Sequence, residues 1–174
     1  MILQLCYYDD PNLRKKSLLI EAISNEIISL ANDMVESMIH YNGVGLAAPQ
    51  VGKLLRLIVI RDEFIGEDEG YQLGPPEILI NPILDTPSPE AEKMAEGCLS
   101  IPGIHAEVMR PLRIRVRYQT LDGRTIEEEA AGFRARVIMH ENDHLNGVLY
   151  IDRVSPDDRA KIDPMLKVLK EKTR

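Results

Sequence analysis

Near the end of the chain, Phe133–Asn146 has the sequence FRARVIMHENDHLN and predicts a buried helix. Its apolar residues occur on more than one side, which is typical of a helix at the centre of a fold. Gly147 follows, and glycine is the residue that helices favour just beyond their last turn. Ionisable residues are rarely buried without partners, so their presence in such a helix indicates a chemical role.

That role is suggested by His140-Glu141-Asn142-Asp143-His144. Positions four apart lie one turn above each other, so His140 and His144 can direct two imidazoles at one metal ion. Glu141 lies beside them and can serve a metal-bound water as general base. The alternative is a pair of histidines that are hydrogen-bonded in the core or solvated. Asp143 does not share this face, and we expect it to pair with an arginine or a backbone group.

A catalytic metal site of this type needs a third protein ligand and an open position. Cys98 is the most conspicuous candidate, because it lies within Glu96–Gly103, EGCLSIPG. The glycine before it and the Pro-Gly pair after it can shape the backbone so that the thiol is presented to a site. An isolated cysteine is more often a small buried apolar residue, but the downstream histidines favour the ligand interpretation.

A third segment, Gly43–Gly52, has the sequence GVGLAAPQVG. Its glycines allow the backbone to approach another group closely, and Gln50 brings an amide that can donate hydrogen bonds. The segment lacks the Gly-Lys-Ser/Thr ending of a phosphate-binding loop. Taken alone, it is equally well explained as a connection between a helix and a strand.

Two amphipathic helices are predicted towards the ends of the chain. Leu19–His40 carries apolar residues at three- and four-residue intervals, and Asn42-Gly43 ends it. Ser155–Lys170 predicts a charged C-terminal helix in which Ser155 is the N-cap. Pro164 is expected to interrupt or kink this helix.

The region between these helices predicts strands. Leu54–Ile60 is β-branched and mostly apolar, which indicates a buried strand, and Ile78–Ile83 indicates another. Between them, Arg61–Glu77 is acidic and rich in Gly and Pro, and we expect a surface loop. Alternation over Leu112–Gln119 predicts a half-buried strand that turns back as a hairpin into Thr125–Glu129.

The order of these elements favours an α+β fold, because helices and strands do not alternate regularly. We expect antiparallel or mixed β-sheets packed around a central metal-binding HExxH helix, with an N-terminal and a C-terminal helix. The length of 174 residues suits one domain, and no change of composition marks a boundary. We therefore expect residues 1–174 to form a single catalytic domain.

Composition excludes several classes of function. The formal net charge is −7, which argues against nucleic-acid specificity and against binding to anionic membranes. No apolar run approaches the roughly 18 residues of a membrane span, and no signal peptide is evident. Two cysteines cannot form a disulfide framework. We expect a cytoplasmic, monomeric protein.

In their order and spacing, three segments resemble the peptide deformylase family: Gly43–Gln50, Glu96–Ser100 and His140–Gly147. The resemblance extends from Ile2 to the terminal helix. This chain departs from the family at Met139, where bacterial members usually carry Gln, and at His105, near an Arg of some members. The loop between Asp62 and Glu77 is also longer than in the most compact members.

The resemblance implies a metal-dependent hydrolase that removes the N-formyl group from the N-terminal formyl-methionine of newly synthesised proteins and releases formate. It implies that Cys98, His140 and His144 hold one divalent metal ion. Fe(2+) is the native ion that the family suggests, and Zn(2+), Ni(2+) or Co(2+) can substitute for it. The expected partners are N-formylmethionyl nascent peptides, and a contact of the C-terminal helix with the ribosome is an open hypothesis.

The resemblance also implies how the reaction proceeds. A metal-bound water attacks the formyl carbon, and Glu141 acts first as general base and then as general acid. The side-chain amide of Gln50 and the backbone N–H of Leu99 stabilise the charge that develops on the formyl oxygen. Gly45 keeps the entrance narrow and contacts the peptide backbone.

Two other classes of protein share part of this pattern. A zinc metalloprotease has the same helix but takes its third ligand from downstream, where Asp152 or Glu171 is available. A protein with a closed structural zinc site needs a fourth protein ligand, for which His105 or Cys6 could serve.

Overall fold

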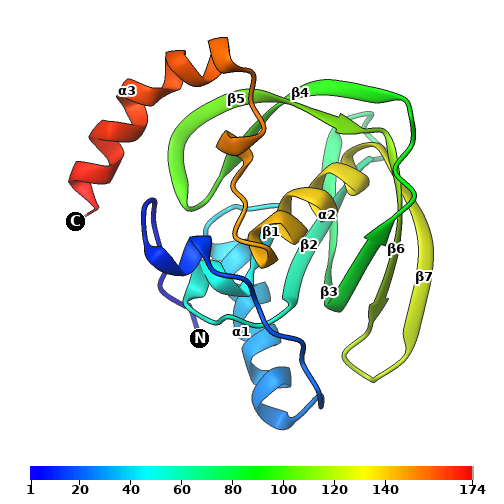
Figure 1. Ribbon diagram of the computed structural model, residues 1–174. Helices are drawn as coiled ribbons and strands as arrows, with labels where there is room; N and C mark the ends of the chain where they lie inside the picture. The colour runs from blue at the N-terminus through cyan, green and yellow to red at the C-terminus, as the bar shows by residue number, and fades with distance from the viewer. Residues whose placement is uncertain (174) are drawn as a thin grey trace.

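Helices and two antiparallel sheets surround one central helix in the computed structural model, which describes residues 1–173 (Figure 1). The helices and strands, in chain order, are α1 Asn25–His40, β1 Gly45–Ala47, β2 Leu57–Ile65, β3 Tyr71–Asp85, β4 Ala91–Cys98, β5 Ile101–Pro111, β6 Arg113–Gln119, β7 Thr125–Ala131, α2 Gly132–Leu145 and α3 Pro156–Lys172. Short 3₁₀ turns occupy η1 Pro11–Arg14, η2 Ala48–Val51 and η3 Tyr150–Asp152. The α+β class and antiparallel sheets are therefore confirmed.

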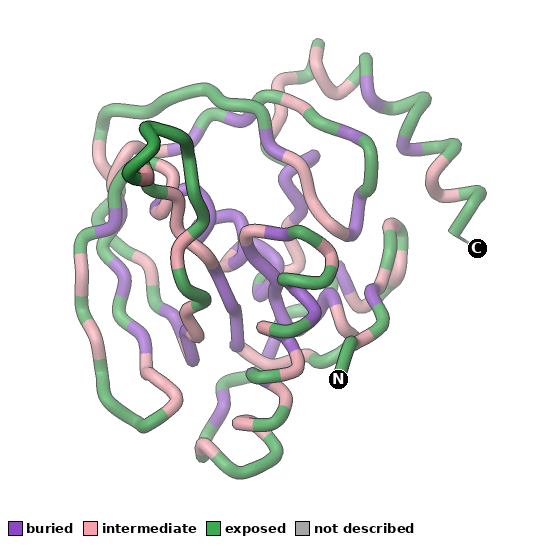
Figure 2. Tube along the Cα trace, turned by 180° about the vertical axis from the view of Figure 1, so that it is seen from behind, coloured by how far each residue is buried: buried purple, intermediate pink, exposed green. Residues whose placement is uncertain are grey.

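The central helix is α2, as its sequence predicts. It lies between the five-stranded sheet, whose order is β1-β2-β3-β6-β7, and the separate β4–β5 hairpin (Figure 1). Ile138 and Leu145 of α2 are fully buried against sheet residues such as Ile58 and Leu79. Buried residues concentrate on α2 and the middle of the sheet (Figure 2).

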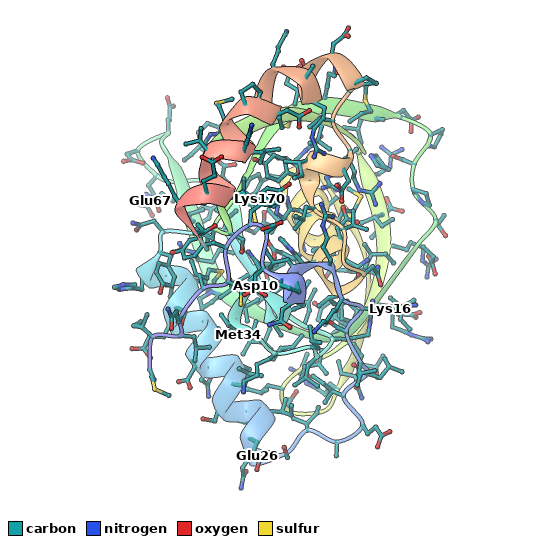
Figure 3. All side chains as sticks on the ribbon, turned by 60° about the vertical axis from the view of Figure 1, so that its left-hand side comes forward. Asp10, Lys16, Glu26, Met34, Glu67 and Lys170 are labelled. Atoms are coloured by element: carbon teal, nitrogen blue, oxygen red, sulfur yellow. The ribbon has the colours of Figure 1, made fainter. Side chains whose placement is uncertain are left out.

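A second apolar cluster forms between α1 and the sheet, where Met34 and Met38 are fully buried. Figure 3 labels Met34 on this helix. The helix begins later than predicted, at Asn25, because the Ser24 side chain accepts a hydrogen bond from the Ile27 N–H and caps it. The preceding residues instead run beside the start of β2, where Leu18 forms a bridge with Leu55.

The prediction of a loop at Arg61–Glu77 is wrong, because most of this segment forms a β-hairpin. β2 and β3 remain paired as far as Ile65 and Tyr71, and only the residues between them form the turn. This hairpin extends beyond the core, so Ile65 and Tyr71 are exposed and Glu67 projects from its tip (Figure 3). The polar composition of this segment correctly indicates that it is exposed to solvent. Its conformation is set by the backbone hydrogen bonds between β2 and β3.

The predicted β6–β7 hairpin is confirmed, and Arg115 and Arg117 lie opposite Glu129 and Glu127. Sequence reasoning missed the β4–β5 hairpin, whose two-residue turn is Leu99-Ser100. Proline and glycine in β5 concealed its strand pattern. The hairpin matters because Cys98 is the last residue of β4.

The C-terminal helix α3 is confirmed, and the Ser155 side chain caps it by accepting the Asp158 N–H. Ile162 and Leu166 bury one face of α3 in a third apolar cluster. Pro164 does not interrupt the helix, because it lies on the exposed side, where water can satisfy the carbonyl left without a donor. Within residues 1–173, no helix is long and apolar enough to cross a membrane.

Gly147 provides a test of how the chain packs at the end of α2. It has a φ of +73°, and a Cβ there would lie 2.5 Å from the Arg14 carbonyl oxygen. Gly123 has a φ of +87° but open space around a Cβ, which makes it a matched control. We expect Gly123→Ala to lower the free energy of unfolding by about 1 kcal/mol through backbone strain alone.

Gly147→Ala should lower the free energy of unfolding by about 1–3 kcal/mol more than Gly123→Ala does, because the Arg14 carbonyl must also move. Urea denaturation of both variants measures the difference. Equal losses for the two variants would contradict the close contact with Arg14.

Candidate metal centre

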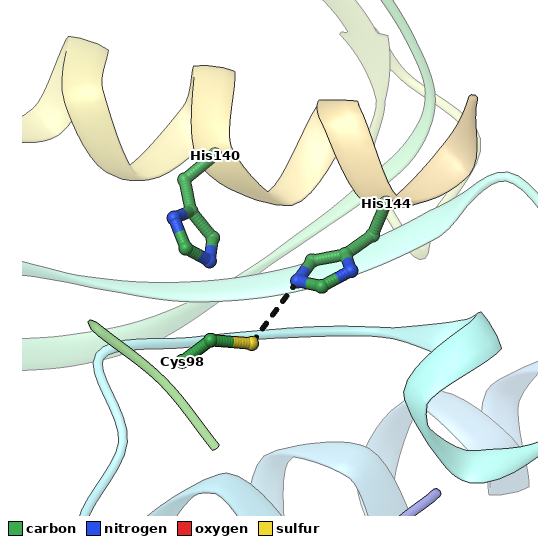
Figure 4. A group of neighbouring side chains, drawn as sticks. All are labelled: Cys98, His140 and His144. Carbon is green, nitrogen blue, oxygen red and sulfur yellow. Dashed lines mark hydrogen bonds between the residues drawn. The ribbon is translucent and has the colours of Figure 1, made fainter. Parts of the chain in front are cut away.

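Cys98, His140 and His144 meet where the β4–β5 turn faces α2 (Figure 4). One ligand atom from each residue lies within 4.8 Å of the others, and His144 Nε2 is 3.4 Å from Cys98 Sγ. Within residues 1–173 this is the only group of three or more His, Cys, Asp or Glu side chains with metal-binding spacing. The structure therefore brings together the three residues that the sequence singled out as ligands.

The other candidate ligands lie outside this cluster of three residues. Asp152 forms an ion pair with Arg14, and Glu171 is exposed in the last turn of α3. His105 packs its ring against Gly97, and Cys6 lies beside Asp10. In the part of the chain that the structure describes, neither a downstream carboxylate nor a fourth ligand completes the cluster, which argues against both alternative classes.

His140 is oriented by the buried carboxylate of Glu96, a partner that sequence reasoning missed. His140 Nδ1 is 2.8 Å from Glu96 Oε1, which leaves Nε2 for the cluster. Arg110 donates to Glu96 from Nε at 2.6 Å and from Nη2 at 3.0 Å, and Arg136 Nη1 donates at 2.7 Å. Burial raises the pKa of Glu96, but hydrogen bonds from His140 and Arg110 outweigh it and lower the pKa to about 2.

Asp143 extends this network, as predicted for a residue off the ligand face. It accepts hydrogen bonds from Arg110 Nη1 at 3.0 Å and from Arg153 Nε at 2.6 Å. Arg110 thus joins a carboxylate of β4 to a carboxylate of α2. The two elements that carry Cys98 and the histidines are held together by charge-assisted hydrogen bonds in a buried environment.

Glu141 is buried beside the cluster, with Oε1 4.0 Å from His140 Nε2. Burial raises the pKa of its carboxyl to about 7, so it can both accept and release a proton near neutral pH. Among the described residues, its Oε2 atom has no hydrogen-bond partner. A Cβ at Gly45 would lie 2.6 Å from Glu141 Oε1, so only glycine lets the carboxylate rest against β1.

Gln50 and Leu99 both adjoin Cys98. Gln50 Nε2 is 3.4 Å from Cys98 Sγ and 3.1 Å from Ser100 Oγ, while its Oε1 accepts the Ala47 N–H at 2.9 Å. These contacts fix which end of the amide faces the cluster. Leu99 follows Cys98 as the first residue of the β4–β5 turn, so its backbone N–H belongs to the peptide bond that joins it to Cys98.

A cavity of about 430 Å³ opens onto the cluster. It is bounded by the segment before and within β1 on one side, by the end of β4 and the start of β5 on the other, and by α2. The residues that define these three walls include Gly43, Val44, Gly45, Gly97, Leu99, Phe133 and Val137.

The donor set fits a divalent metal ion. A cysteine thiolate and two imidazole nitrogens are ligands for Zn(2+), Fe(2+) and related ions. Burial lowers the pKa of His144 well below its usual value, so its imidazole is neutral, as a ligand must be. The Glu96 carboxylate behind His140 is the usual outer partner of a ligating histidine. With Glu141 beside these donors in a cavity, the site is that of a metal-dependent hydrolase.

Comparison with known proteins supports a narrower assignment. The family model for polypeptide deformylase matches residues 2–160. A peptide deformylase of Thermotoga neapolitana is 42% identical over 167 residues, which cover 96% of each chain. The crystal structure of peptide deformylase from Thermotoga maritima aligns with a TM-score of 0.80 and 42% identity, covering 90% of this chain and 99% of that one.

The crystal structure of peptide deformylase from Ehrlichia chaffeensis aligns with a TM-score of 0.88 and 37% identity, covering 99% of this chain and 98% of that one. The chain therefore belongs to the polypeptide deformylase family. Its enzymatic activity is peptide deformylation.

The Glu96 network can be tested against an exposed ion pair. Glu96→Gln removes the only anion that pairs with Arg136 among the described residues and leaves Arg110 with Asp143 alone, so we expect a loss of about 3–5 kcal/mol in the free energy of unfolding. Glu90→Gln is the control, because Glu90 pairs with Arg113 on the surface and should change stability by less than about 1 kcal/mol. Urea denaturation measures both values.

The affinity of the Glu96→Gln variant for Zn(2+) should also fall by about 10–100-fold, because His140 loses its outer partner. Competition with a chromogenic chelator measures this affinity. Unchanged affinity would show that Glu96 has no part in orienting the histidine.

Proposed function

We propose that this enzyme removes the formyl group from the N-terminal formyl-methionine of newly synthesised proteins, with residues 1–174 as one catalytic domain. The observation that carries the proposal is the position of Glu141. Its buried carboxylate lies beside Cys98, His140 and His144 at the inner end of a cavity that is open between two strand segments. This arrangement suits hydrolysis of an amide at the end of an extended chain.

The shape of the cavity supports a peptide N-terminus as substrate. β1 is the edge strand of its sheet, and β4 pairs with β5 on one side only, so each presents an unpaired edge within the described chain. An extended peptide can hydrogen-bond to such edges. Val44, Phe133 and Val137 add apolar walls that suit the side chain of methionine.

The ligand set is Cys98, His140 and His144, and a divalent cation held there would act as a Lewis acid and lower the pKa of a water molecule. The chain supplies the remaining chemistry. Glu141, with a pKa of about 7, takes a proton from the attacking water and returns it to the departing amine. Gln50 Nε2 and the Leu99 N–H donate hydrogen bonds to the formyl oxygen as negative charge develops on it.

Fe(2+) is the native metal in this proposal, with Zn(2+), Ni(2+) or Co(2+) as substitutes. One thiolate and two imidazoles accommodate all of these ions, and Fe(2+) binds a given site less tightly than the later metals. The cysteine thiolate also makes an iron-loaded site sensitive to oxidation.

The remaining proposals concern the setting of the enzyme. We place it in the cytoplasm as a monomer that acts on nascent peptides and has no nucleic-acid or membrane specificity. Its net charge of −7 supports the lack of general affinity for anionic surfaces. The exposed charged face of α3 supports the hypothesis of a ribosome contact.

Formate release from formyl-Met-Ala-Ser tests the function. Enzyme prepared anaerobically with Fe(2+), or with Ni(2+), should release formate, and acetyl-Met-Ala-Ser should be cleaved far more slowly. Glu141→Gln keeps the size of the side chain but removes the base, so we expect kcat to fall by about 10²–10⁴-fold while metal content is unchanged.

Cys98→Ala should instead lose the metal. A Glu141→Gln enzyme that keeps more than a tenth of the wild-type kcat would disprove the assigned role of Glu141.

The choice of metal predicts a difference in stability towards air. The Fe(2+) enzyme should lose activity on aerobic incubation, whereas the Ni(2+) enzyme should keep it, because Ni(2+) is not readily oxidised beside a thiolate. Activity assays over time, with mass spectrometry of Cys98 for added oxygen, measure the effect. Equal losses in the two forms would contradict an iron-dependent cause.

A further inference from the structure

Arg61 of β2 holds the segment that forms one wall of the cavity. Its guanidinium donates to the Gly43 carbonyl oxygen from Nη2 at 2.6 Å and from Nε at 3.2 Å. Its backbone N–H donates to the Val44 carbonyl oxygen at 2.8 Å. One residue thus satisfies two consecutive carbonyls beside the proposed substrate site.

Arg61 also brings a positive charge that is not neutralised. No carboxylate among residues 1–173 forms an ion pair with it, and its side chain is partly exposed. Arg110, Arg134 and Arg136, in contrast, each form ion pairs with glutamates. The cavity itself is lined by Glu96, Arg136 and Glu141, and Arg136 is paired with Glu96. Arg61 lies behind this lining, against Gly43, so its unpaired charge acts on a ligand that lies beside Gly43.

The direction in which a bound peptide leaves the cavity follows from burial. The reacting end lies at Gly45, against Glu141. Beyond Gly45, β1 and η2 are buried through Gln50, which closes that direction. In the other direction Asn42 is exposed, so the peptide must leave along Gly45 towards Gly43 and Asn42.

The spacing then identifies the substrate residue that reaches Arg61. Gly43 is two residues from Gly45, which corresponds to roughly 6.6 Å in extended chain, the same advance as two residues of an extended peptide. With formyl-methionine at Gly45, the third residue of the peptide lies beside Gly43 and the guanidinium that holds it.

We propose that Arg61 is a specificity-determining residue that favours an acidic side chain, and disfavours a basic one, at the third residue of the substrate. The inference rests on the proposed function and extends it from formyl-methionine to the following sequence. Because the charge is partly solvated, its effect is modest and sensitive to salt.

Three peptides test the proposal: formyl-Met-Ala-Glu-Ser, formyl-Met-Ala-Gln-Ser and formyl-Met-Ala-Lys-Ser. The quantity measured is the ratio of kcat/KM for the Glu peptide to that for the Lys peptide, with the nickel-loaded enzyme at low salt. We expect a wild-type ratio of about fivefold, typical of partly exposed charges, and a decline towards one in 0.5 M NaCl.

Matched variants separate charge from structure. Arg61→Gln should bring the ratio to within twofold of one, and Arg61→Lys should retain a preference for Glu because it keeps the charge. Arg117→Gln removes an exposed arginine of β6 that faces Glu127, away from the cavity, and should keep the wild-type ratio. Metal content and melting temperature of each variant confirm that the site and fold are intact.

The outcomes distinguish two failures. If the wild type hydrolyses the Gln peptide but shows no difference between Glu and Lys, or if Arg61→Gln keeps the wild-type ratio, the specificity proposal is wrong and the proposed function stands. If the wild type releases formate from none of the three peptides, the proposed function fails and this specificity fails with it.

Discussion

The site depends on the buried negative charge of Glu96. This carboxylate receives hydrogen bonds from His140 of α2, from Arg110 of β5 and from Arg136 of α2. A charge removed from water is tolerated only when its lone pairs are satisfied, so the β4–β5 hairpin and α2 have one relative position that meets this requirement. That position brings Cys98, at the end of β4, to the two histidines.

The same constraint extends from stability to chemistry. Arg110 is shared between Glu96 and Asp143, so the network that joins the hairpin to the helix also sets the direction of the His140 ring. Glu141 is placed by a different means, the absence of a side chain at Gly45. Glu141 therefore lies in a buried and tightly packed environment, where burial raises its pKa into the range useful for proton transfer.

Particular elements show how far sequence reasoning reached. The α2 helix was predictable because its apolar periodicity and its histidine spacing agree, and both are local properties. The β2–β3 hairpin was mistaken for a loop because it extends beyond the core, so its strands lack the alternation that burial imposes. The β4–β5 hairpin was missed for a related reason, since Pro102, Gly103 and Pro111 obscure the pattern of β5. Glu96 was quoted only as a neighbour of Cys98, and no local pattern marks it as the partner of His140.

By itself, the sequence determined the two histidines one helical turn apart, the glutamate beside them and the resemblance of three short segments to one family. These features are local, because residues within one helical turn or one tight turn are held together by the backbone itself. Only the tertiary structure decided which carboxylate orients His140 and why position 45 must be glycine. Those relations connect residues far apart in the chain, and they exist only where packing and charge neutralisation bring separate elements together.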